Sequence, residues 1–168
     1  YDMIIMLCSN VPGAGKDTVA NLLSKKMNAK IGSFASPVKE LAKLGGWNGK
    51  KDDKGRELLI GIGETFKKYD KHTWSNLLYN KVFPMIENNI IVSDFRYVCE
   101  IDFIEKVSRY TTVLVIGIER DGIEMSDIVK ENQSEYEKLP KNFIIKNNGT
   151  LSDLEYEVEK ILNQIRRR

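Results

Sequence analysis

Cysteine and histidine, the residues that build zinc sites and disulfide frameworks, are scarce in this chain. Two cysteines, Cys8 and Cys99, and one histidine, His72, occur among 168 residues, and no CxxC spacing is present. A zinc site is therefore excluded. Cys8 lies within an apolar run, where a thiol usually packs as a small hydrophobe, and we interpret both cysteines as reduced. Reduced thiols are typical of the cytoplasm, so we expect a cytoplasmic protein.

Long apolar runs and a large excess of charge are also missing. The longest unbroken apolar runs, residues 3–8 and 113–118, fall far short of the roughly 18 residues that a membrane helix needs. The formal net charge of +2 is too small to indicate nucleic-acid binding. The three arginines that end the chain, Arg166, Arg167 and Arg168, complement the dipole of a helix C-terminus. We expect no membrane partner, no nucleic-acid partner and no targeting signal.

Apolar segments of strand length recur along the chain and alternate with helical patterns. The composition, 42% hydrophobic and 30% charged, is that of an ordinary globular protein, and 168 residues suit one domain. The candidate strands are residues 3–8, 29–34, 89–94, 111–118 and 142–146. Strands that alternate with helices predict an α/β fold with a parallel sheet and right-handed crossovers.

Helical patterns occupy most of the gaps between these strands. A helix is predicted directly after residue 15, and others over residues 38–44, 56–68, 73–82 and 150–168. Ser36 is the expected N-cap of the second helix, with Pro37 at its first position, and Thr150 or Ser152 caps the last. Residues 119–140 are polar and hard to place in a core, and long segments of this kind are often functional lids.

A glycine-rich turn separates the first strand from the first helix, which is the position of a phosphate-binding P-loop. The turn reads Asn10-Val11-Pro12-Gly13-Ala14-Gly15-Lys16-Asp17-Thr18. Its glycines allow backbone N–H groups to turn toward phosphate oxygens, and the helix N-terminus adds a positive partial charge. Lys16 is placed to reach the β- and γ-phosphates of a nucleotide. We predict that this segment binds ATP.

Two positions of the P-loop depart from the consensus GxxxxGK[ST]. Asn10 stands at the first glycine position, and asparagine tolerates a positive φ, so we expect this change to be mild. Asp17 follows Lys16 where the consensus has a hydroxyl that binds magnesium. Either Thr18 supplies that hydroxyl, or Asp17 acts through water or on the acceptor.

An apolar strand that ends in an acid and a base gives a second signal. Asp94 and Arg96 follow residues 90–93, and ligands of parallel sheets bind at the carboxyl ends of strands, so we expect both to face the P-loop. Asp94 is a candidate to hold magnesium-bound water, and Arg96 to bind an anionic substrate bidentately. A structural ion pair at the strand end is the alternative.

Together these residues resemble the deoxynucleoside monophosphate kinases of bacteriophages, a branch of the P-loop kinases related to adenylate kinase. The likeness covers nearly the whole chain, although only the P-loop is specific by itself. The other marks, in order, are Ser36-Pro37-Val38-Lys39-Glu40, Gly46-Trp47, Arg56-Glu57-Leu58-Leu59, Gly63, Asp70, Trp74, Asp94-Phe95-Arg96, Glu100, Ser134-Glu135, Leu139-Pro140 and Asn147-Asn148-Gly149-Thr150-Leu151.

The resemblance implies a three-layer α/β/α P-loop NTPase fold with a five-stranded parallel sheet, formed as one domain by residues 1–168. It implies an acceptor-binding helical region at about residues 35–85 and a lid at about residues 119–140. ATP and Mg²⁺ are the implied cofactors, with Thr18 and Asp94 as candidate magnesium ligands, the latter through water. A deoxynucleoside monophosphate is the implied acceptor, a homodimer is an open question, and a phage-encoded enzyme would act in the host cytoplasm.

The resemblance also assigns expected roles to single side chains. The candidates for acceptor binding are Lys39, Arg56, Trp74, Asp94, Arg96 and Glu135, and the candidate catalytic residues are Lys16, Asp17, Arg96 and Arg120. Asn147 and Gly149 are expected beside the ATP base, and Arg120 would neutralise charge on the transferring phosphoryl group. The default for Arg56 is a solvated surface arginine. For Trp74, the apolar stripe that it shares with Leu77 and Leu78 favours core packing over base stacking.

Two departures from the resemblance leave the acceptor open. Gly63-Glu64-Thr65 stands where many relatives have Gly-Thr-Asp, and Asn132 stands where a lid histidine is common. A P-loop kinase for another phosphorylated metabolite, such as phosphomevalonate or dephospho-coenzyme A, is therefore a second hypothesis. A nucleotide-binding protein without turnover is a third, because the P-loop itself is altered. A nucleic-acid-binding protein is the weakest, since basic residues alternate with acids.

Overall fold

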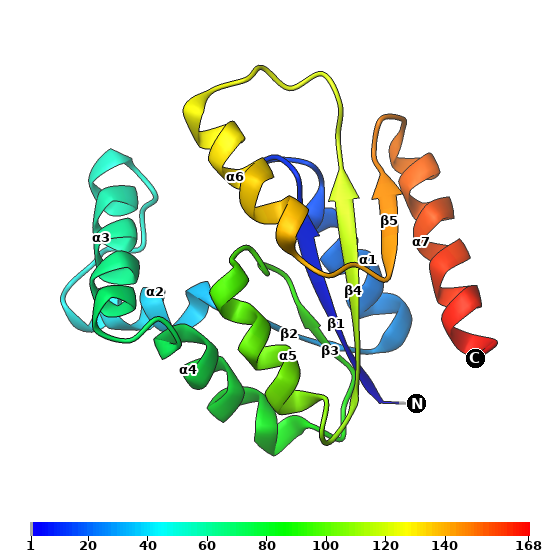
Figure 1. Ribbon diagram of the computed structural model, residues 1–168, viewed down its shortest axis with the longest axis horizontal. Coiled ribbons are helices and arrows are strands. Elements are labelled where there is room, and N and C mark those ends of the chain that lie inside the picture. The colour runs from blue at the N-terminus through cyan, green and yellow to red at the C-terminus, as the bar shows by residue number, and fades with distance from the viewer. Residues whose placement is uncertain (1) are drawn as a thin grey trace.

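Five parallel strands form one sheet at the centre of the molecule. The computed structural model describes residues 2–168. Its strands are β1 (Met3–Ser9), β2 (Lys30–Gly32), β3 (Ile90–Val92), β4 (Thr112–Glu119) and β5 (Phe143–Lys146). Their order across the sheet is β2-β3-β1-β4-β5, and β1 pairs in parallel with β3 on one side and β4 on the other (Figure 1). The predicted five-stranded parallel sheet is confirmed.

The helices lie near the predicted positions. Within residues 2–168 they are α1 (Lys16–Met27), α2 (Ala35–Leu44), α3 (Asp53–Tyr69), α4 (Thr73–Val82), α5 (Ile101–Val107), α6 (Asp127–Lys138) and α7 (Leu151–Arg166), with 3₁₀ turns at Phe83–Met85 and Val98–Glu100. α4 has the predicted bounds, and α3 begins three residues earlier than expected because Asp52 caps it by accepting from Gly55 N–H. No helix in this part of the chain is both long enough and apolar enough to cross a membrane.

The two faces of β1 belong to two hydrophobic clusters, which makes the fold three layers thick. Met3, Ile5 and Leu7 pack in the cluster that contains residues of α1 and α7, whereas the residues between them pack with α2, α4 and α5. This alternation follows from the two-residue period of a strand. Cys8 is fully buried, and burial raises the pKa of its thiol to about 11, so it packs as a small hydrophobe as expected.

The topology brings three loops to one edge of the sheet. After β1 the chain forms β2 and β3 on one side, and it then crosses to form β4 and β5 on the other. β1 is therefore the strand at which the winding reverses, and in open α/β sheets ligands bind outside the carboxyl ends of strands at this point. Figure 1 shows α2 and α3 projecting to one side of the sheet and the segment between β4 and α6 forming an arch above it.

The predicted N-cap of α2 is wrong. The helix begins at Ala35, so Ser36 and Pro37 lie in its first turn. The Asp94 carboxylate caps it instead, because Oδ1 accepts from Phe34 N–H at 2.8 Å and Oδ2 from Ala35 N–H at 3.0 Å. Pro37 is tolerated there because first-turn N–H groups have no helical partner. A cap that comes from about sixty residues away has no local sequence signal.

The polar segment 119–140 has more core contact than its composition suggests. Its second half forms α6, in which Val129 and Tyr136 are buried. The Tyr136 hydroxyl donates to Glu119 Oε2 at 2.7 Å, which ties α6 to the end of β4. Val129 and Tyr136 lie on the same face of α6, but two buried positions are too few to reveal this packing in an otherwise charged sequence.

Candidate functional site

The carboxyl ends of β1 and β3 open into a cleft of about 820 Å³. The P-loop and the start of α1 form one wall, which we call the donor wall. The other wall, formed by α2, α3 and the segment after β3, we call the acceptor wall. The charged side chains that line the cleft are Lys16, Asp17, Lys39, Lys51, Arg56, Glu64, Lys67, Asp94, Arg96 and Glu100. Basic groups outnumber acidic ones, so the cleft suits an anionic ligand.

Two glycines give the P-loop its shape. Gly13 and Gly15 have φ values of 74° and 104°, in the left-handed region that glycine occupies without strain. A side chain at Gly15 would also collide with Asn147, whose Nδ2 donates to Ala14 O at 2.8 Å. The loop after β5 therefore braces the P-loop directly. The side-chain amide of Asn147 thus holds the P-loop, and its place beside the ATP base stays a prediction.

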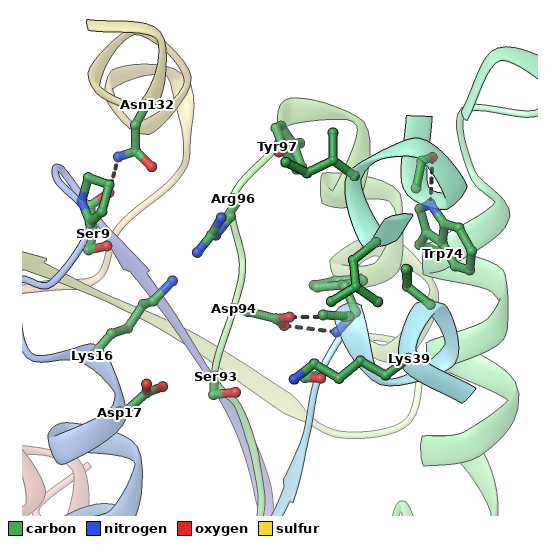
Figure 2. A pocket seen from close by; sticks show the side chains of 18 of the residues that line it. Ser9, Lys16, Asp17, Lys39, Trp74, Ser93, Asp94, Arg96, Tyr97 and Asn132 are labelled. Atoms are coloured by element: carbon green, nitrogen blue, oxygen red, sulfur yellow. Dashed lines mark hydrogen bonds between the residues drawn. The ribbon is translucent and has the colours of Figure 1, made fainter. Parts of the chain in front are cut away.

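Lys16 and Arg96 bring two positive charges together across the cleft. Figure 2 shows the Arg96 guanidinium and the Lys16 ammonium pointing toward one another, with Asp17 beside the start of α1. Burial and the nearby Arg96 lower the pKa of Lys16, and Asp94 and Asp17 oppose this shift. Like charges at close range favour an anion between them. This is the arrangement expected around a phosphoryl group.

Asp94 is less available than the sequence suggested. Both of its oxygens already accept backbone N–H groups, from Phe34 and Ala35, at the start of α2. Each oxygen keeps a lone pair for water, so the magnesium role stays a prediction. What the geometry establishes is a structural role: Asp94 joins the end of β3 to α2, and thus the two halves of the acceptor wall.

Asn10, which stands at the first consensus glycine position, acts through its side chain. Within residues 2–168 only Asn28 is a non-glycine residue with positive φ, so Asn10 does not use the conformational tolerance that made the change look mild. Its side chain instead forms a reciprocal pair with the Arg120 backbone: Oδ1 accepts from N–H at 3.1 Å, and Nδ2 donates to the carbonyl oxygen at 3.3 Å. Arg120 Nη1 in turn donates to Gly13 O at 3.5 Å. Asn10 therefore anchors Arg120 against the P-loop.

Asn132 adds a further tie between α6 and the P-loop. Its Nδ2 donates to Ser9 O at 2.9 Å and to Asn10 O at 2.8 Å, and it lines the cleft. The sequence had identified this position only as a departure from the family pattern. The amide nitrogen carries two hydrogens, one for each carbonyl oxygen, whereas a ring nitrogen of histidine carries one, so the asparagine has a structural reason of its own.

The acceptor wall contains two lysines that lie near each other. Lys39, on α2, and Lys51, in the loop before α3, both line the cleft. Burial and then Lys51 lower the pKa of Lys39, with opposite contributions from Asp94 and Asp17. Arg56 also lines the cleft and is exposed. Lys51 was not predicted, because it lies in a run of charged residues where no pattern singles out one side chain.

Trp74 is a core residue with one surface on the cleft. It is 4% exposed, its Nε1 donates to Gly63 O at 3.1 Å, and its ring meets Phe66 edge-on with centroids 5.5 Å apart. Because the indole N–H and one edge are already engaged, the geometry agrees with the packing role that its apolar stripe favoured. It also fixes α3 to α4, which keeps the wall of the cleft in place.

Several predicted residues lie apart from the cleft lining, which lacks Asn10, Val11, Ala14, Arg120, Glu135, Asn147 and Gly149. Glu135, on α6, accepts from Val98 N–H at 3.1 Å and so contacts the segment after β3 from outside. Gly149 precedes α7, where a side chain would collide with Asp153. Thr150, and not Ser152, is the N-cap of α7. The Asp153 carboxylate accepts a hydrogen bond from Thr150 N–H at 2.8 Å, which completes a capping box.

Glu100 is a cleft residue to which the sequence assigned no role. It is 5% exposed, and its Oε1 accepts from Arg96 N–H at 2.8 Å and from Tyr97 N–H at 2.9 Å. Burial raises the pKa of its carboxyl to about 8. A carboxyl group four residues after a catalytic candidate was visible in the sequence, but its burial was not.

The residues present fit a magnesium ion that arrives with a nucleotide. Within residues 2–168, no group of three or more His, Cys, Asp or Glu side chains could hold a metal by itself. Asp17 and Thr18 line the cleft beside Lys16. Magnesium at phosphate sites usually keeps several waters and binds one or two protein side chains, so this sparse oxygen set is sufficient.

Comparisons with known proteins support the fold. No family model and no curated protein match the sequence. Among solved structures, a shikimate kinase from Acinetobacter baumannii in complex with shikimate superposes with a TM-score of 0.61 at 12% identity, covering 98% of this chain and 92% of that one. A dephospho-CoA kinase from Campylobacter jejuni gives 0.57 at 15% identity, with 96% of each chain covered.

A sugar kinase from Janibacter gives a TM-score of 0.52 at 13% identity, covering 97% of this chain and 95% of that one. These three kinases are named for three different acceptor substrates. The fold of this chain is thus that of the P-loop kinases, a three-layer α/β/α arrangement on a five-stranded parallel sheet. Fold alone does not select a substrate.

Proposed function

We propose that this protein transfers the γ-phosphoryl group of MgATP to the phosphate of a deoxynucleoside monophosphate. The observation that carries the proposal is a cleft with two sets of cations. Lys16 and Arg96 face each other beside the P-loop, and a second set, Lys39, Lys51 and Arg56, lines the acceptor wall. A substrate that brings its own phosphate would give the second set a partner.

The donor wall supports ATP as the phosphoryl donor. Left-handed Gly13 and Gly15 turn the loop around the N-terminus of α1, where backbone N–H groups and the helix dipole favour phosphate. Lys16 adds a charge from the first position of that helix. When bound, MgATP supplies the group to be transferred and an ion that neutralises part of its charge.

The acceptor wall supports a phosphorylated, partly apolar acceptor. Beside its cations it presents Val38, Leu59 and Trp74, which offer an apolar surface suited to a base and sugar. Residues 35–85 are the proposed acceptor-binding region, and they form α2, α3 and α4, which project from the sheet (Figure 1). No general base is required, because an acceptor phosphate already carries a nucleophilic oxygen.

Residues 119–140 are the proposed lid. Asn10 holds the Arg120 backbone by hydrogen bonds. The side-chain amide of Asn148 accepts from Asp121 N–H and donates to the Asp121 carboxylate, both at 2.9 Å, so the base of the segment is fixed. Gly122 follows with φ of 76°, and we infer that closure moves the arch between Gly122 and the start of α6, since Asn132 and Tyr136 hold α6 in place. Catalysis then rests on positioning and on charge neutralisation by Lys16, Arg96 and Arg120.

The test is ADP release from MgATP in a coupled assay, with dAMP, dGMP, dCMP and dTMP supplied one at a time and the ribonucleotides in parallel. Release that depends on one or more deoxynucleotides is the expected result. Shikimate, dephospho-coenzyme A and phosphomevalonate serve as comparison acceptors. Turnover with one of these alone would replace the proposed acceptor, and tight ATP binding without release under any acceptor would indicate a nucleotide-binding protein without turnover.

A further inference from the structure

Glu100 is a buried carboxyl group in the wall of a cleft that otherwise favours anions. Burying an acid costs free energy unless hydrogen bonds or an opposite charge compensate it. The charged groups that face it come from other segments: Asp94, from the end of β3, raises its pKa, and Lys67, on α3, lowers it. None of the salt bridges within residues 2–168 includes Glu100. Its position therefore calls for a functional or structural reason.

One of its two oxygens has a structural reason. Oε1 accepts from Arg96 N–H and Tyr97 N–H, which uses both lone pairs and holds the segment that carries Arg96 into the cleft. Glu135 supports the same segment from α6, by accepting from Val98 N–H. Among residues 2–168, no donor binds Glu100 Oε2. Glu100 lines the cleft, and Oε2 is not among the buried side-chain atoms that lack a partner, so water or a ligand in the cleft can reach it.

The protonation state decides what Oε2 can offer. Burial raises the pKa of the carboxyl to about 8, even though the two N–H bonds from Arg96 and Tyr97 act in the opposite direction. Near neutral pH the group therefore carries a proton. Because both lone pairs of Oε1 are occupied, that proton resides on Oε2. Lys67 is held elsewhere, with Nζ 3.3 Å from the centre of the Tyr97 ring and 3.9 Å from Glu64.

We propose that Glu100 is a specificity-determining residue that donates a hydrogen bond from Oε2 to the acceptor substrate, at a carbonyl oxygen or an unprotonated ring nitrogen of its base. The proposal rests on the function proposed above. A buried donor rejects an analogue that lacks the matching acceptor atom, because the donor would then be left unpaired. Substrates that fill the apolar part of the cleft without such an atom would be rejected.

Ionisation separates this role from a purely structural one. A charged carboxylate accepts backbone N–H groups more strongly than a neutral acid does, so loss of the proton would strengthen the hold on Arg96 and Tyr97. The same loss removes the donor at Oε2. A structural role thus predicts no loss of acceptor binding at alkaline pH, whereas the donor role predicts a fall.

The experiment compares wild type with Glu100→Gln between pH 7 and 9, where the second ionisation of the substrate phosphate, near pH 6, is complete. Glutamine keeps an acceptor oxygen for the two N–H groups and a donor that does not titrate. Each profile of kcat/KM for the deoxynucleotide is normalised to its own value at pH 7. Relative to Glu100→Gln, wild type should fall by up to about tenfold per pH unit above the pKa of Glu100. Lys16 and Lys39, whose pKa values are lowered, are present in both proteins and cancel in this comparison.

Glu105→Gln is the matched control, an exposed glutamate on α5 that should keep the wild-type profile. A wild-type profile that is flat, or a Glu100→Gln profile that falls like wild type, would overturn the role of Glu100. Deoxynucleotide binding by calorimetry at pH 7 and 9 gives the same comparison without turnover. If wild type releases no ADP with any deoxynucleotide, the proposed function itself has failed, and that result is visible before any variant is made.

Discussion

The two walls of the cleft are built in different ways. The donor wall comes from one continuous stretch of chain, and side-chain amides of Asn10, Asn132 and Asn147 tie it down through hydrogen bonds to backbone atoms. The acceptor wall combines α2, α3 and the segment after β3, and Asp94 and Glu100, which are both acids, hold it together. One wall is fixed by neutral groups and the other by titratable ones.

This difference separates the chemistry from the selectivity. Phosphate binding needs backbone N–H groups and one cation, which a local motif supplies. Choosing an acceptor needs charges and donors at set positions, and these depend on protonation and on residues far apart in the chain. The donor wall should thus respond to single substitutions in its motif, and the acceptor wall to pH and to charge.

The largest effect is expected at the donor wall. Lys16→Ala should lower kcat by roughly 10²–10³-fold or more, because it removes a charge aimed at the transferring phosphoryl group. The coupled ADP assay measures this, with circular dichroism to verify folding. Lys25→Ala, an exposed lysine on the same helix, is the control and should be unaffected. Near-normal turnover by Lys16→Ala would remove the P-loop from the mechanism.

The acceptor wall should make stability depend on pH. The folded pKa of Glu100, about 8, lies above its ordinary value of 4.5, so the folded state binds the extra proton between these values. The free energy of unfolding should then fall by about 1.4 kcal/mol per pH unit across this window and level off above it. Urea unfolding of wild type and Glu100→Gln at pH 5, 6.5 and 8 measures the difference.

The glutamine variant lacks the titrating proton. As pH rises, its free energy of unfolding should therefore increase steadily relative to that of wild type. Parallel curves for the two proteins would show that Glu100 is ionised in the folded state. They would also remove the contrast between a donor wall tied by neutral amides and an acceptor wall held by a titrating acid.

The cations of the acceptor wall should affect one substrate and not the other. Lys51→Met should raise KM for the acceptor by roughly tenfold, the value of one charged hydrogen bond, and leave KM for ATP unchanged. Lys39→Met should act in the same direction. Lys50→Met, next in sequence and outside the cleft lining, is the control. An equal rise in both KM values would mean that these lysines do not separate the two substrates.

The smallest effect is expected from restoring the P-loop consensus. Asn10→Gly matches GxxxxGK[ST] at its first position but removes both bonds to the Arg120 backbone. We expect a loss of about 1 kcal/mol in the free energy of unfolding, and turnover lowered a few-fold, because exposed bonds contribute modestly. Thermal unfolding and the ADP assay measure the two. Equal or higher activity in Asn10→Gly would mean that turnover does not need the two Asn10 hydrogen bonds to Arg120.

Local patterns were sufficient for most of the fold. The buried run that became β1 and the amphipathic stripe of α7 were correctly placed, because burial on one or two faces leaves a period in the sequence. The start of α2 was not, because its cap is Asp94. α6 was hidden in a polar segment whose buried positions, Val129 and Tyr136, were too few to form a pattern.

The amino-acid sequence by itself determined the P-loop, the parallel sheet and the edge where the site would lie, since each follows from a local motif or from the alternation of strand and helix patterns along the chain. Only the tertiary structure decided that Asn10 acts through its side chain, that Asp94 caps a helix and that Lys51 belongs to the cleft. The protonation of Glu100 depends on burial, which no single stretch of sequence encodes. Long-range hydrogen bonds and desolvation are properties of the assembled chain, and they govern the acceptor wall.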